Sequence, residues 1–316
     1  MDSRLILSLK KQKNYYGSKI SILSPAKINL YLNILNRYKD GFHQIESIVE
    51  RISLCDEIAI TVEKTSSIKI SSNRKELASD QNLIVKAARL IKDRFKLKFG
   101  FSLHLNKNIP VGSGLGGGSS NAASTLIGLN EILRLGLKKD ELYELGAKLG
   151  SDVNFFLSEN RFAFLKGRGE HVESLHIGKK FKHFIIWPDV SISTKKVYEN
   201  SRVNPVRNIY PAKEKNKISN GAKLTKFFNN AKILQYALKK GDIFLIKRSI
   251  FNALEKSSFT VCKKLARAKE YLKDKGIFSK MTGSGSALYT ISRDFSISKL
   301  KKDVPADWLI FEAETF

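Results

Sequence analysis

The sequence holds only two cysteines among 316 residues, and no apolar run approaches the roughly 20 residues that a transmembrane helix needs. Two cysteines cannot build a disulfide framework, which fits a reducing cytoplasm. The first 20 residues contain a short apolar patch, but their positive charges follow it and no small-residue cleavage site is visible. We therefore expect a cytoplasmic protein with a basic N-terminal extension and no membrane partner.

Acidic residues are also scarce, since 30 Asp and Glu stand against 56 Lys and Arg and leave a net charge of +26. Such an excess can attract nucleic acid or steer a phosphorylated substrate. The lysines are scattered in pairs, such as Lys10-Lys11 and Lys263-Lys264, and are not gathered in one arm. We favour lysines that cover solvated faces and predict no nucleic-acid partner. A basic nucleic-acid-binding protein stays the alternative from another functional class.

Strand-like and helix-like segments follow one another without regular alternation, which predicts α+β architecture with two mixed-sheet domains. Apolar and polar residues alternate over 26–34, so this strand should be half-buried, with Lys27 and Asn29 on the face opposite the core. A turn is expected at 39–41 and a long surface loop at 200–226. Further strands are expected at 45–54, 58–62, 101–105, 162–165, 184–187, 278–281, 287–291 and 308–311, and helices at 82–95, 138–149, 224–238, 243–254 and 261–275.

Five glycines lie within the seven positions from Gly112 to Gly118, between a predicted strand and an amphipathic helix. Glycine in such number costs conformational entropy and therefore needs a reason. A strand, a glycine loop and a helix N-terminus together form an anion site, because N–H groups and the positive end of the helix dipole point at one place. We predict a phosphate-binding loop followed by a helix that Ser119, Ser120 or Asn121 can cap.

Several known phosphate-binding motifs do not fit this loop. A Walker A loop needs Lys six residues after its first glycine, where this chain has Gly118. The dinucleotide pattern G-x-G-x-x-G matches at Gly112, Gly114 and Gly117, but it lacks an N-terminal βαβ setting. The H-R-D and D-F-G motifs of protein kinases are absent from the sequence.

The segment PVGSGLGGGSS, residues 110–120, resembles the ATP loop of the GHMP small-molecule kinases. The segments SPAKINLYLNI, GFHQIES, QNLIVKAARL, LGSDV, VSISTKKVY and MTGSGSALY resemble further motifs of that family, in order, over about residues 24–289. The resemblance implies an N-terminal ATP-binding domain of the ribosomal protein S5 domain 2-like type, residues 1–172. It also implies a C-terminal ferredoxin-like GHMP domain, residues 173–316, with the active site in the cleft between them.

By this resemblance, backbone N–H groups of the loop wrap the phosphates of ATP, which Mg²⁺ accompanies. The residues assigned to the nucleotide are Asn82, Pro110, Gly112, Ser113, Gly114, Leu115, Gly116, Gly117, Gly118, Ser119 and Ser120. The hydroxyls of Ser119 and Ser120 are candidates for phosphate or Mg²⁺, with plain N-capping as an equal alternative. The sequence has no His/Cys cluster with zinc spacing and no D-x-D pair, so we predict no other metal.

The resemblance also assigns two catalytic residues. Asp152 would take the proton from the substrate alcohol, although Asp152 after Gly150-Ser151 also suits a turn or a helix cap. Lys27 would pair with Asp152 and screen the developing negative charge, although a solvated strand lysine is common in so basic a chain.

The stretch Asp40-Gly41-Phe42-His43 resembles the family branch whose substrate carries cytidine diphosphate. That branch uses ATP to phosphorylate the 2-hydroxyl of 4-diphosphocytidyl-2-C-methyl-D-erythritol, in the non-mevalonate route to isoprenoids. The alternative is another GHMP kinase, acting on mevalonate, phosphomevalonate, homoserine or a sugar. We expect a monomer or homodimer. The residues assigned to the substrate are Asn29, Phe42, His43, Asp152, Tyr198, Gly283 and Gly285.

Overall fold

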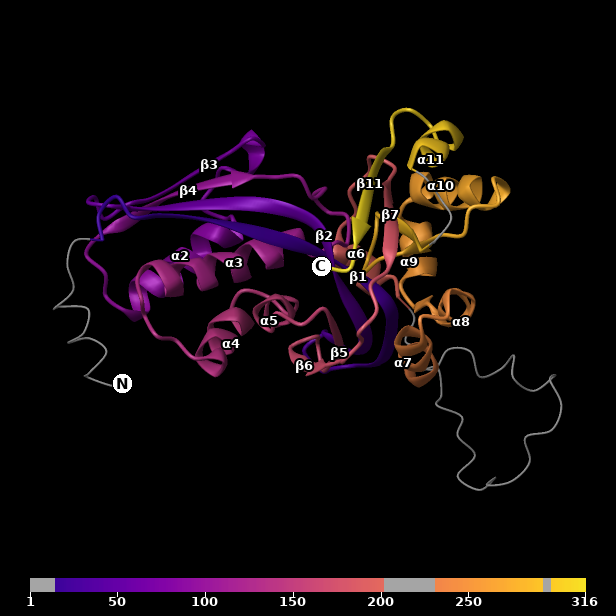
Figure 1. Cartoon of the computed structure of the whole chain (residues 1–316), viewed down its shortest axis with the longest axis horizontal. Coiled ribbons are helices and arrows are strands. Elements are labelled where there is room, and N and C mark those ends of the chain that lie inside the picture. The colour runs from indigo at the N-terminus through magenta and orange to yellow at the C-terminus, as the bar shows by residue number, and fades with distance from the viewer. Residues whose placement is uncertain (1–14, 202–230, 292–296) are drawn as a thin grey trace, which may run out of the picture. The chain divides into compact units, whose positions relative to one another are not determined.

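The computed structural model describes residues 15–201, 231–291 and 297–316 (Figure 1). Most of the predicted basic extension and of the predicted loop at 200–226 therefore lies outside the described residues. The chain forms two compact units. The described residues of the first unit are 15–27, 53–111 and 116–160, and those of the second are 28–52, 112–115, 161–201, 231–291 and 297–316. The predicted domain boundary at residue 172 stays a prediction.

The first unit packs helices against one side of a group of strands (Figure 1). Within it, β2 pairs antiparallel with β4, and β4 pairs in parallel with β3. Helices α2 and α3 pack on each other, and α3 also packs on α5. The strands that contribute are β1 (Lys19–Arg37), β2 (His43–Glu63), β3 (Ile68–Ser72) and β4 (Gly100–Asn106), and the helices are α2 (Leu83–Arg94), α3 (Gly117–Ile132), α4 (Lys139–Ala147) and α5 (Val153–Leu157), with a 3-10 turn at Lys75–Leu77.

The second unit is built on an antiparallel sheet with the strand order β11-β7-β10-β9. Three further strands are β5 and β6, which pair with each other, and β8, which pairs in parallel with β1. The strands are β5 (Phe162–Lys166), β6 (His171–Ser174), β7 (Lys182–Trp187), β8 (Phe251–Asn252), β9 (Lys280–Met281), β10 (Leu288–Ile291) and β11 (Leu309–Glu314). The helices are α6 (Thr194–Glu199), α7 (Ala231–Lys240), α8 (Ile243–Ser249), α9 (Glu255–Val261), α10 (Lys263–Asp274) and α11 (Ile297–Asp303).

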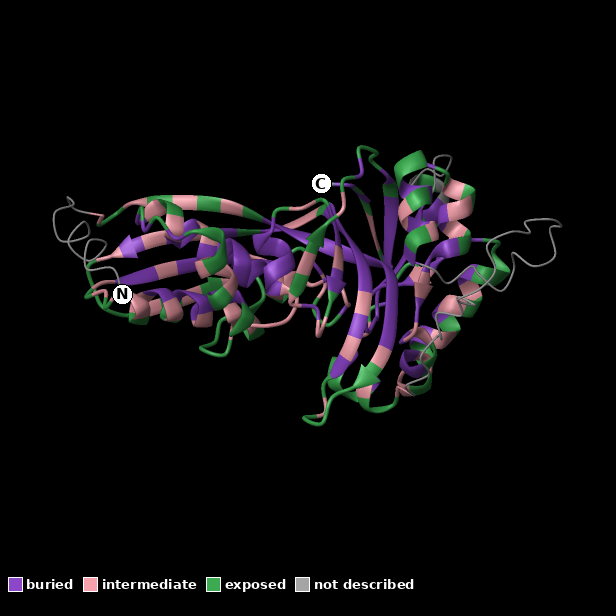
Figure 2. Cartoon of the chain, turned by 90° about the horizontal axis from the view of Figure 1, so that it is seen from below, coloured by how far each residue is buried: buried purple, intermediate pink, exposed green. Residues whose placement is uncertain are grey.

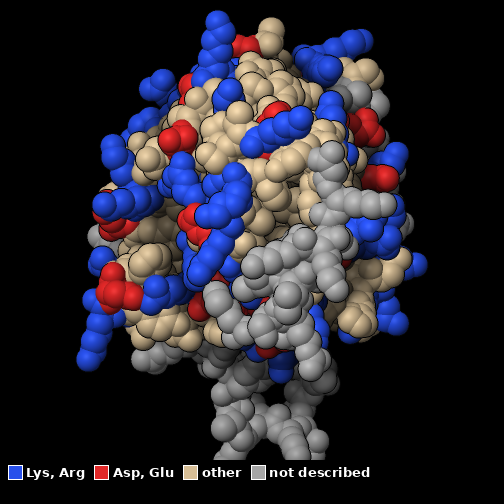
Figure 3. Space-filling view, turned by 90° about the vertical axis from the view of Figure 1, so that its left-hand side faces the viewer, with Lys and Arg blue, Asp and Glu red and all other residues tan. Residues whose placement is uncertain are grey.

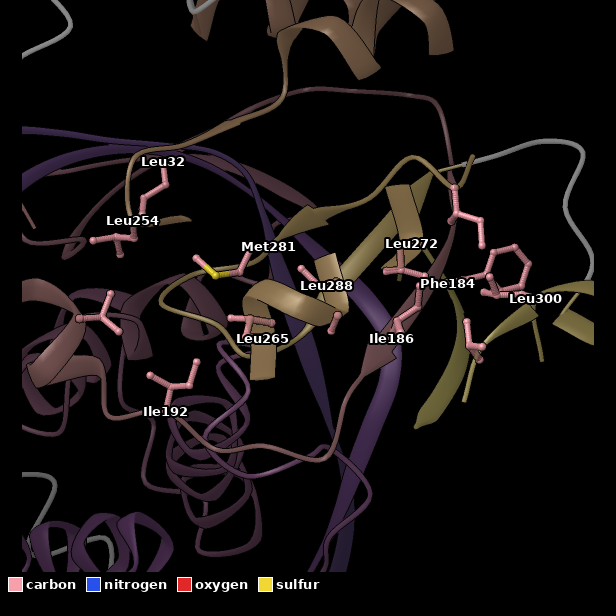
Figure 4. Close-up of a cluster of buried hydrophobic side chains, with 14 of the residues drawn as sticks. Leu32, Phe184, Ile186, Ile192, Leu254, Leu265, Leu272, Met281, Leu288 and Leu300 are labelled. Atoms are coloured by element: carbon pink, nitrogen blue, oxygen red, sulfur yellow. The ribbon is translucent and has the colours of Figure 1, made fainter. Parts of the chain in front are cut away.

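The core of the second unit lies between this sheet and helix α10. Figure 4 shows Phe184 and Ile186 of β7 near Leu265 and Leu272 of α10, all of them buried. Leu265, Ala268 and Leu272 recur on one face of α10, the spacing of an amphipathic helix. The predicted helix at 261–275 is therefore confirmed to within two residues.

Strand β1 departs from the predicted half-buried pattern, because its middle is buried on both faces (Figure 2). Lys27 is only 4% exposed and Asn29 only 3%. Buried polar side chains need partners, and both residues have them, as the next section describes. The expectation of a solvated polar face was therefore wrong.

Two other predicted elements change. The strand-like stretches at 45–54 and 58–62 are one continuous strand, β2. The predicted helix at 243–254 ends at Ser249, because Phe251 and Asn252 pair with Tyr31 and Leu32 of β1. The α+β class is confirmed. Both cysteines lie within the described residues and form no disulfide. Among the helices that the structure describes, none is long and apolar enough to cross a membrane.

Candidate active site

Helix α3 begins at Gly117, directly within the glycine-rich segment. Its N-cap is Gly116, whose backbone is left-handed at φ 71°, a conformation that glycine adopts at no steric cost. No side chain caps the helix, so the predicted capping by Ser119, Ser120 or Asn121 was wrong. The N–H groups of the first turn have no partner within a helix. They are therefore donors suited to an anion.

Lys27 lies against this helix start in the first unit. A Cβ on Gly116 would come within 3.0 Å of Lys27 Cγ and 3.1 Å of its Cε. The ammonium Nζ of Lys27 is 3.4 Å from Asp152 Oδ2. The Lys27 side chain is 6% exposed, whereas that of Asp152 is 35% exposed. The geometry thus places a cation and a partly accessible carboxylate beside the glycine-rich helix start.

Asp152 immediately precedes α5 but does not cap it, because its side chain accepts no hydrogen bond from the helix. The alternative of a cap aspartate is therefore excluded. The carboxylate forms an ion pair with the buried Lys27. Asn154, in the first turn of α5, is buried.

The two serines of the loop differ in position. Ser120 is completely buried, and its hydroxyl accepts a hydrogen bond from Ser24 Oγ at 2.9 Å. Ser119 is partly exposed, and a Cβ on Gly150 would lie 3.9 Å from its Oγ. Ser119 is therefore the more exposed of the two serines. Asn82 caps α2, because its Oδ1 accepts from the Ile84 N–H at 3.0 Å and its Nδ2 donates to the Leu77 carbonyl at 2.8 Å.

Ser119 is the partly exposed hydroxyl that the resemblance relates to Mg²⁺. Among the described residues, no three His, Cys, Asp or Glu side chains form a group that could hold a metal ion. Mg²⁺ bound with a nucleotide usually keeps several waters and takes one or two protein oxygens beside phosphate oxygens. The hydroxyl of Ser119 is an oxygen donor of that kind. Pro110, which the resemblance also assigns to the nucleotide, is partly exposed.

The first part of the glycine loop, residues 112–115, belongs to the second unit and packs there against the loop between β9 and β10, residues 282–287. A Cβ on Gly114 would lie 2.3 Å from the Thr282 carbonyl oxygen, and one on Gly283 would lie 2.9 Å from the Gly114 carbonyl oxygen. The Ala287 N–H donates to the Ser113 carbonyl at 2.9 Å. Gly114 and Gly283 thus allow two backbones to touch, which is a packing reason for glycine independent of any ligand. The remaining residues assigned by sequence here are Gly112 at φ 65°, Gly285 at φ 82° and the buried Ser113 and Leu115.

Asn29 joins β1 to this loop, to β10 and to β2. Its backbone N–H donates to Thr282 Oγ1 at 3.0 Å, and its carbonyl accepts from the Tyr289 hydroxyl at 3.1 Å. Its side-chain Nδ2 donates to Ser47 Oγ at 2.8 Å. The amide nitrogen of the side chain is therefore engaged within the protein. Substrate binding by Asn29 stays a prediction.

The structure brings His43 and Tyr198 together in the second unit, as two of the residues assigned to the substrate. Their ring centroids are 5.1 Å apart with the planes tilted by 37°. His43 is 8% exposed, and the pKa of its imidazole is lowered by burial and, second, by the charge of Arg37. The ring is therefore neutral at pH 7, with one nitrogen as donor and one as acceptor.

Phe42 is 54% exposed beside His43, and one face of its ring is covered. The guanidinium of Arg168 lies 4.4 Å from the Phe42 ring centroid and forms an ion pair with Asp40. Sequence reasoning missed Arg168. Its only sequence signal was its place between Gly167 and Gly169.

Comparison with known proteins identifies the family and the fold. The model of the GHMP kinase N-terminal domain matches residues 82–160, and that of the GHMP kinase C-terminal domain matches residues 234–308. These segments lie on either side of residue 172. Among solved structures, the fold resembles a 4-(cytidine 5'-diphospho)-2C-methyl-D-erythritol kinase with a TM-score of 0.70 and 24% identity, covering 93% of this chain and 99% of that one. It also resembles the homoserine kinase of Cytophaga hutchinsonii with a TM-score of 0.67 and 17% identity, covering 96% of each chain.

Two curated relatives are more similar in sequence. The 4-diphosphocytidyl-2-C-methyl-D-erythritol kinase of Prochlorococcus marinus subsp. pastoris is 37% identical over 89% of this chain and 88% of that protein. The enzyme of the same name from Bacillus cytotoxicus is 35% identical over 86% of this chain and 87% of that protein. Since relatives of one name match nearly the whole chain at this identity, the chain belongs to the 4-diphosphocytidyl-2-C-methyl-D-erythritol kinase family of the GHMP kinases.

Proposed function

We propose that this chain transfers the γ-phosphoryl group of ATP to the 2-hydroxyl of 4-diphosphocytidyl-2-C-methyl-D-erythritol, which yields the 2-phosphate and ADP. The observation that carries the proposal is the Lys27–Asp152 pair beside the start of α3. Phosphoryl transfer needs donors for the phosphates, a positive charge near the reacting oxygen and a group that orients the nucleophile. In the first unit, Lys27 contacts Gly116 at the helix start and pairs with Asp152, which supports this assignment of the three roles.

The chain's own residues act as follows. Asp152 accepts the proton of the substrate 2-hydroxyl while the hydroxyl oxygen attacks the γ-phosphorus of ATP. The bond between the γ-phosphorus and the bridging oxygen breaks, and ADP leaves. Lys27 stands 3.4 Å from that carboxylate and screens the negative charge that develops on the attacking oxygen. The N–H groups at the start of α3 and the positive end of its dipole hold the phosphates. Mg²⁺, when bound with ATP, neutralises phosphate charge, and Ser119 is the residue that would hold it.

Recognition of the cytidine falls to the second unit. The neutral imidazole of His43 makes no hydrogen bond among the described residues, so it is available to pair with the base. The ring centroid of Tyr198 lies 5.1 Å from that of His43, and Phe42 is the exposed residue that precedes His43 in the chain. Both provide aromatic faces for the base. A mevalonate, homoserine or sugar substrate has no base that would use these groups.

The scatter of lysines along the sequence does not favour the nucleic-acid alternative. On the face shown in Figure 3, Lys and Arg side chains are spread among Asp and Glu side chains and do not form a single patch. That distribution suits solvated lysines. The chain is proposed to act in the cytoplasm as a monomer or homodimer.

The test is ATP-dependent ADP release by the purified protein with Mg²⁺. The substrates offered are 4-diphosphocytidyl-2-C-methyl-D-erythritol, mevalonate, phosphomevalonate, homoserine and galactose. We expect turnover only with the cytidine-bearing alcohol. Turnover confined to another alcohol would retain the kinase chemistry and overturn the substrate. Folded protein without turnover, combined with DNA or RNA binding that weakens steeply with salt, would favour the nucleic-acid alternative.

A further inference from the structure

Asp56 of β2 is completely buried in the first unit, and its carboxylate accepts four hydrogen bonds. Oδ1 accepts from the backbone N–H groups of Asn108 at 2.7 Å and Ile109 at 2.8 Å. Oδ2 accepts from Lys107 Nζ at 2.6 Å and from Asn121 Nδ2 at 2.9 Å. Residues 107–109 lie shortly before the glycines 112–118, and Asn121 lies shortly after them. One carboxylate therefore holds both ends of the loop.

Lys107 fixes the position of this carboxylate beneath the helix start. Its Nζ donates to the Ile109 carbonyl at 2.7 Å as well as to Asp56, and its side chain is only 7% exposed. A Cβ on Gly117 would lie 2.9 Å from Lys107 Nζ. The first residue of α3 thus rests directly on the buried ion pair.

The network reaches the first turns of α3 through a second contact. Asn121 Nδ2 also donates to Ser24 Oγ at 2.9 Å, and that hydroxyl donates to Ser120 Oγ at 2.9 Å. Ser24 and Ser120 are both 0% exposed. Strands β1 and β2, the segment before the loop and helix α3 are consequently joined by polar side chains that have fixed partners.

Stability alone is a weak reason for such a network. Taking two charges out of water costs about as much as their attraction returns, and apolar side chains of similar volume often serve as well. A satisfied buried network does, however, fix one geometry. N–H groups bind a phosphate best when they are held in place before the ligand arrives.

We propose that Asp56 is a positioning residue for nucleotide binding, because it sets the geometry of the glycine loop through residues 107–109 and Asn121. This inference rests on the proposed function, in which the loop holds the phosphates of ATP. Asp56 touches neither substrate in this account and acts through the loop alone.

The experiment compares Asn121→Ala and Asp56→Asn with Glu50→Gln. Glu50 is a matched control, because it is also completely buried on β2 but lies in the second unit. Its Oε1 accepts from Thr315 Oγ1 at 2.6 Å and lies 3.0 Å from His183 Nε2. For each folded variant, calorimetry measures the Kd of a non-hydrolysable ATP analogue with Mg²⁺ and the Kd of CDP. Thermal melting is recorded in parallel.

We expect both variants of the network to weaken the binding of the ATP analogue by about tenfold or more, equivalent to about 1.4 kcal/mol, while the Kd of CDP stays unchanged. Glu50→Gln should lower the melting temperature and leave the Kd of the ATP analogue unchanged. Asn121→Ala keeps the Lys107–Asp56 pair, so it decides the matter if Asp56→Asn does not fold.

A purely structural network would lower the melting temperature of the variants without changing nucleotide affinity, and that result would overturn the inference. Wild-type protein that binds no ATP analogue would overturn the proposed function and this inference with it. Wild-type binding together with unchanged binding in Asn121→Ala would overturn the inference alone.

Discussion

The ammonium of Lys27 lies 3.4 Å from the carboxylate of Asp152, although the two residues are far apart in the chain. Lys27 comes from a strand that is buried on both faces, and Asp152 stands just before a short buried helix. A lysine held at 6% exposure needs a compensating charge, and the carboxylate supplies it. The burial of Lys27 in the first unit therefore depends on its ion pair with Asp152.

Replacing Asp152 with Asn tests the proposed base. The amide keeps the shape of the carboxylate but cannot accept the proton, so we expect turnover to fall roughly 10²–10⁴-fold. ATP affinity should stay close to that of the wild type, because Asp152 does not form the loop. Steady-state turnover and the Kd of ATP are the measurements. Asp140→Asn, an exposed carboxylate in the first turn of α4, is the control. Near-normal turnover of Asp152→Asn would remove it from the mechanism.

The sequence predicted the parts of the fold that depend on local pattern. The helices at 82–95 and 261–275 have apolar residues at helical spacing, and both are present. Lys27 and Asp152 were paired only through family resemblance, since no local pattern brings residues so far apart together. The structure provides that contact.

The sequence did not predict the roles of residues whose environment is set by contacts with distant parts of the chain. Ser120 was a candidate for capping or for the ligand, but a partner on β1 buries it. No sequence pattern predicts the buried pair of Asp56 and Lys107, because a single acid in a strand and a single lysine in a basic chain are common. The contact of Arg168 with the Phe42 ring is seen only in the structure.

Gly118→Ala separates a ligand role for the glycine loop from a packing role. A Cβ at Gly118 would meet only Leu83 Cδ1 at 3.6 Å, an ordinary contact. Alanine also favours a helix by roughly 0.5–1 kcal/mol over glycine, so stability should not fall. We expect an unchanged or higher melting temperature together with a KM for ATP raised by about tenfold, as loss of about 1.4 kcal/mol of binding implies. Unchanged kinetics would show that no phosphate approaches this position.

The two serines should behave differently when replaced by alanine. Ser119→Ala removes a partly exposed oxygen donor, so the concentration of Mg²⁺ that gives half-maximal turnover should rise. Ser120→Ala removes a buried acceptor, so it should cost about 1–3 kcal/mol of unfolding free energy and leave the Mg²⁺ dependence alone. Titration with Mg²⁺ and denaturant unfolding distinguish them. The reverse pattern would assign the ligand role to Ser120.

Arg168→Lys tests whether the guanidinium prepares Phe42 for the base. Lysine keeps the charge opposite Asp40 but loses the planar group that lies over the Phe42 ring. A cation–π contact at such a site is worth about 0.5–1 kcal/mol, so the KM for the cytidine substrate should rise about two- to fivefold. The KM for ATP should not change. Arg161→Lys, an exposed arginine of the same unit, is the control. Equal kinetics in the two variants would refute a role for Arg168.

The proposed role of His43 in binding the base predicts how the substrate affinity depends on pH. Burial and the charge of Arg37 lower the pKa of its imidazole from 6.5, so the folded protein resists protonation that the unfolded chain accepts. The contribution to folding stability is therefore complete above pH 6.5 and declines as the pH falls below that value.

Protonation of His43 should also lower the affinity for the base of the substrate. The neutral ring offers one acceptor nitrogen, which protonation removes. The apparent affinity for the cytidine substrate should be constant from pH 8 to pH 6.5 and should fall only below pH 6.5. The measurement is kcat/KM for the cytidine substrate against pH, with KM for ATP followed in parallel. His43→Gln should lower kcat/KM and abolish the decline in acid. An apparent pKa above 6.5, or a decline that persists in His43→Gln, would mean that another group controls it.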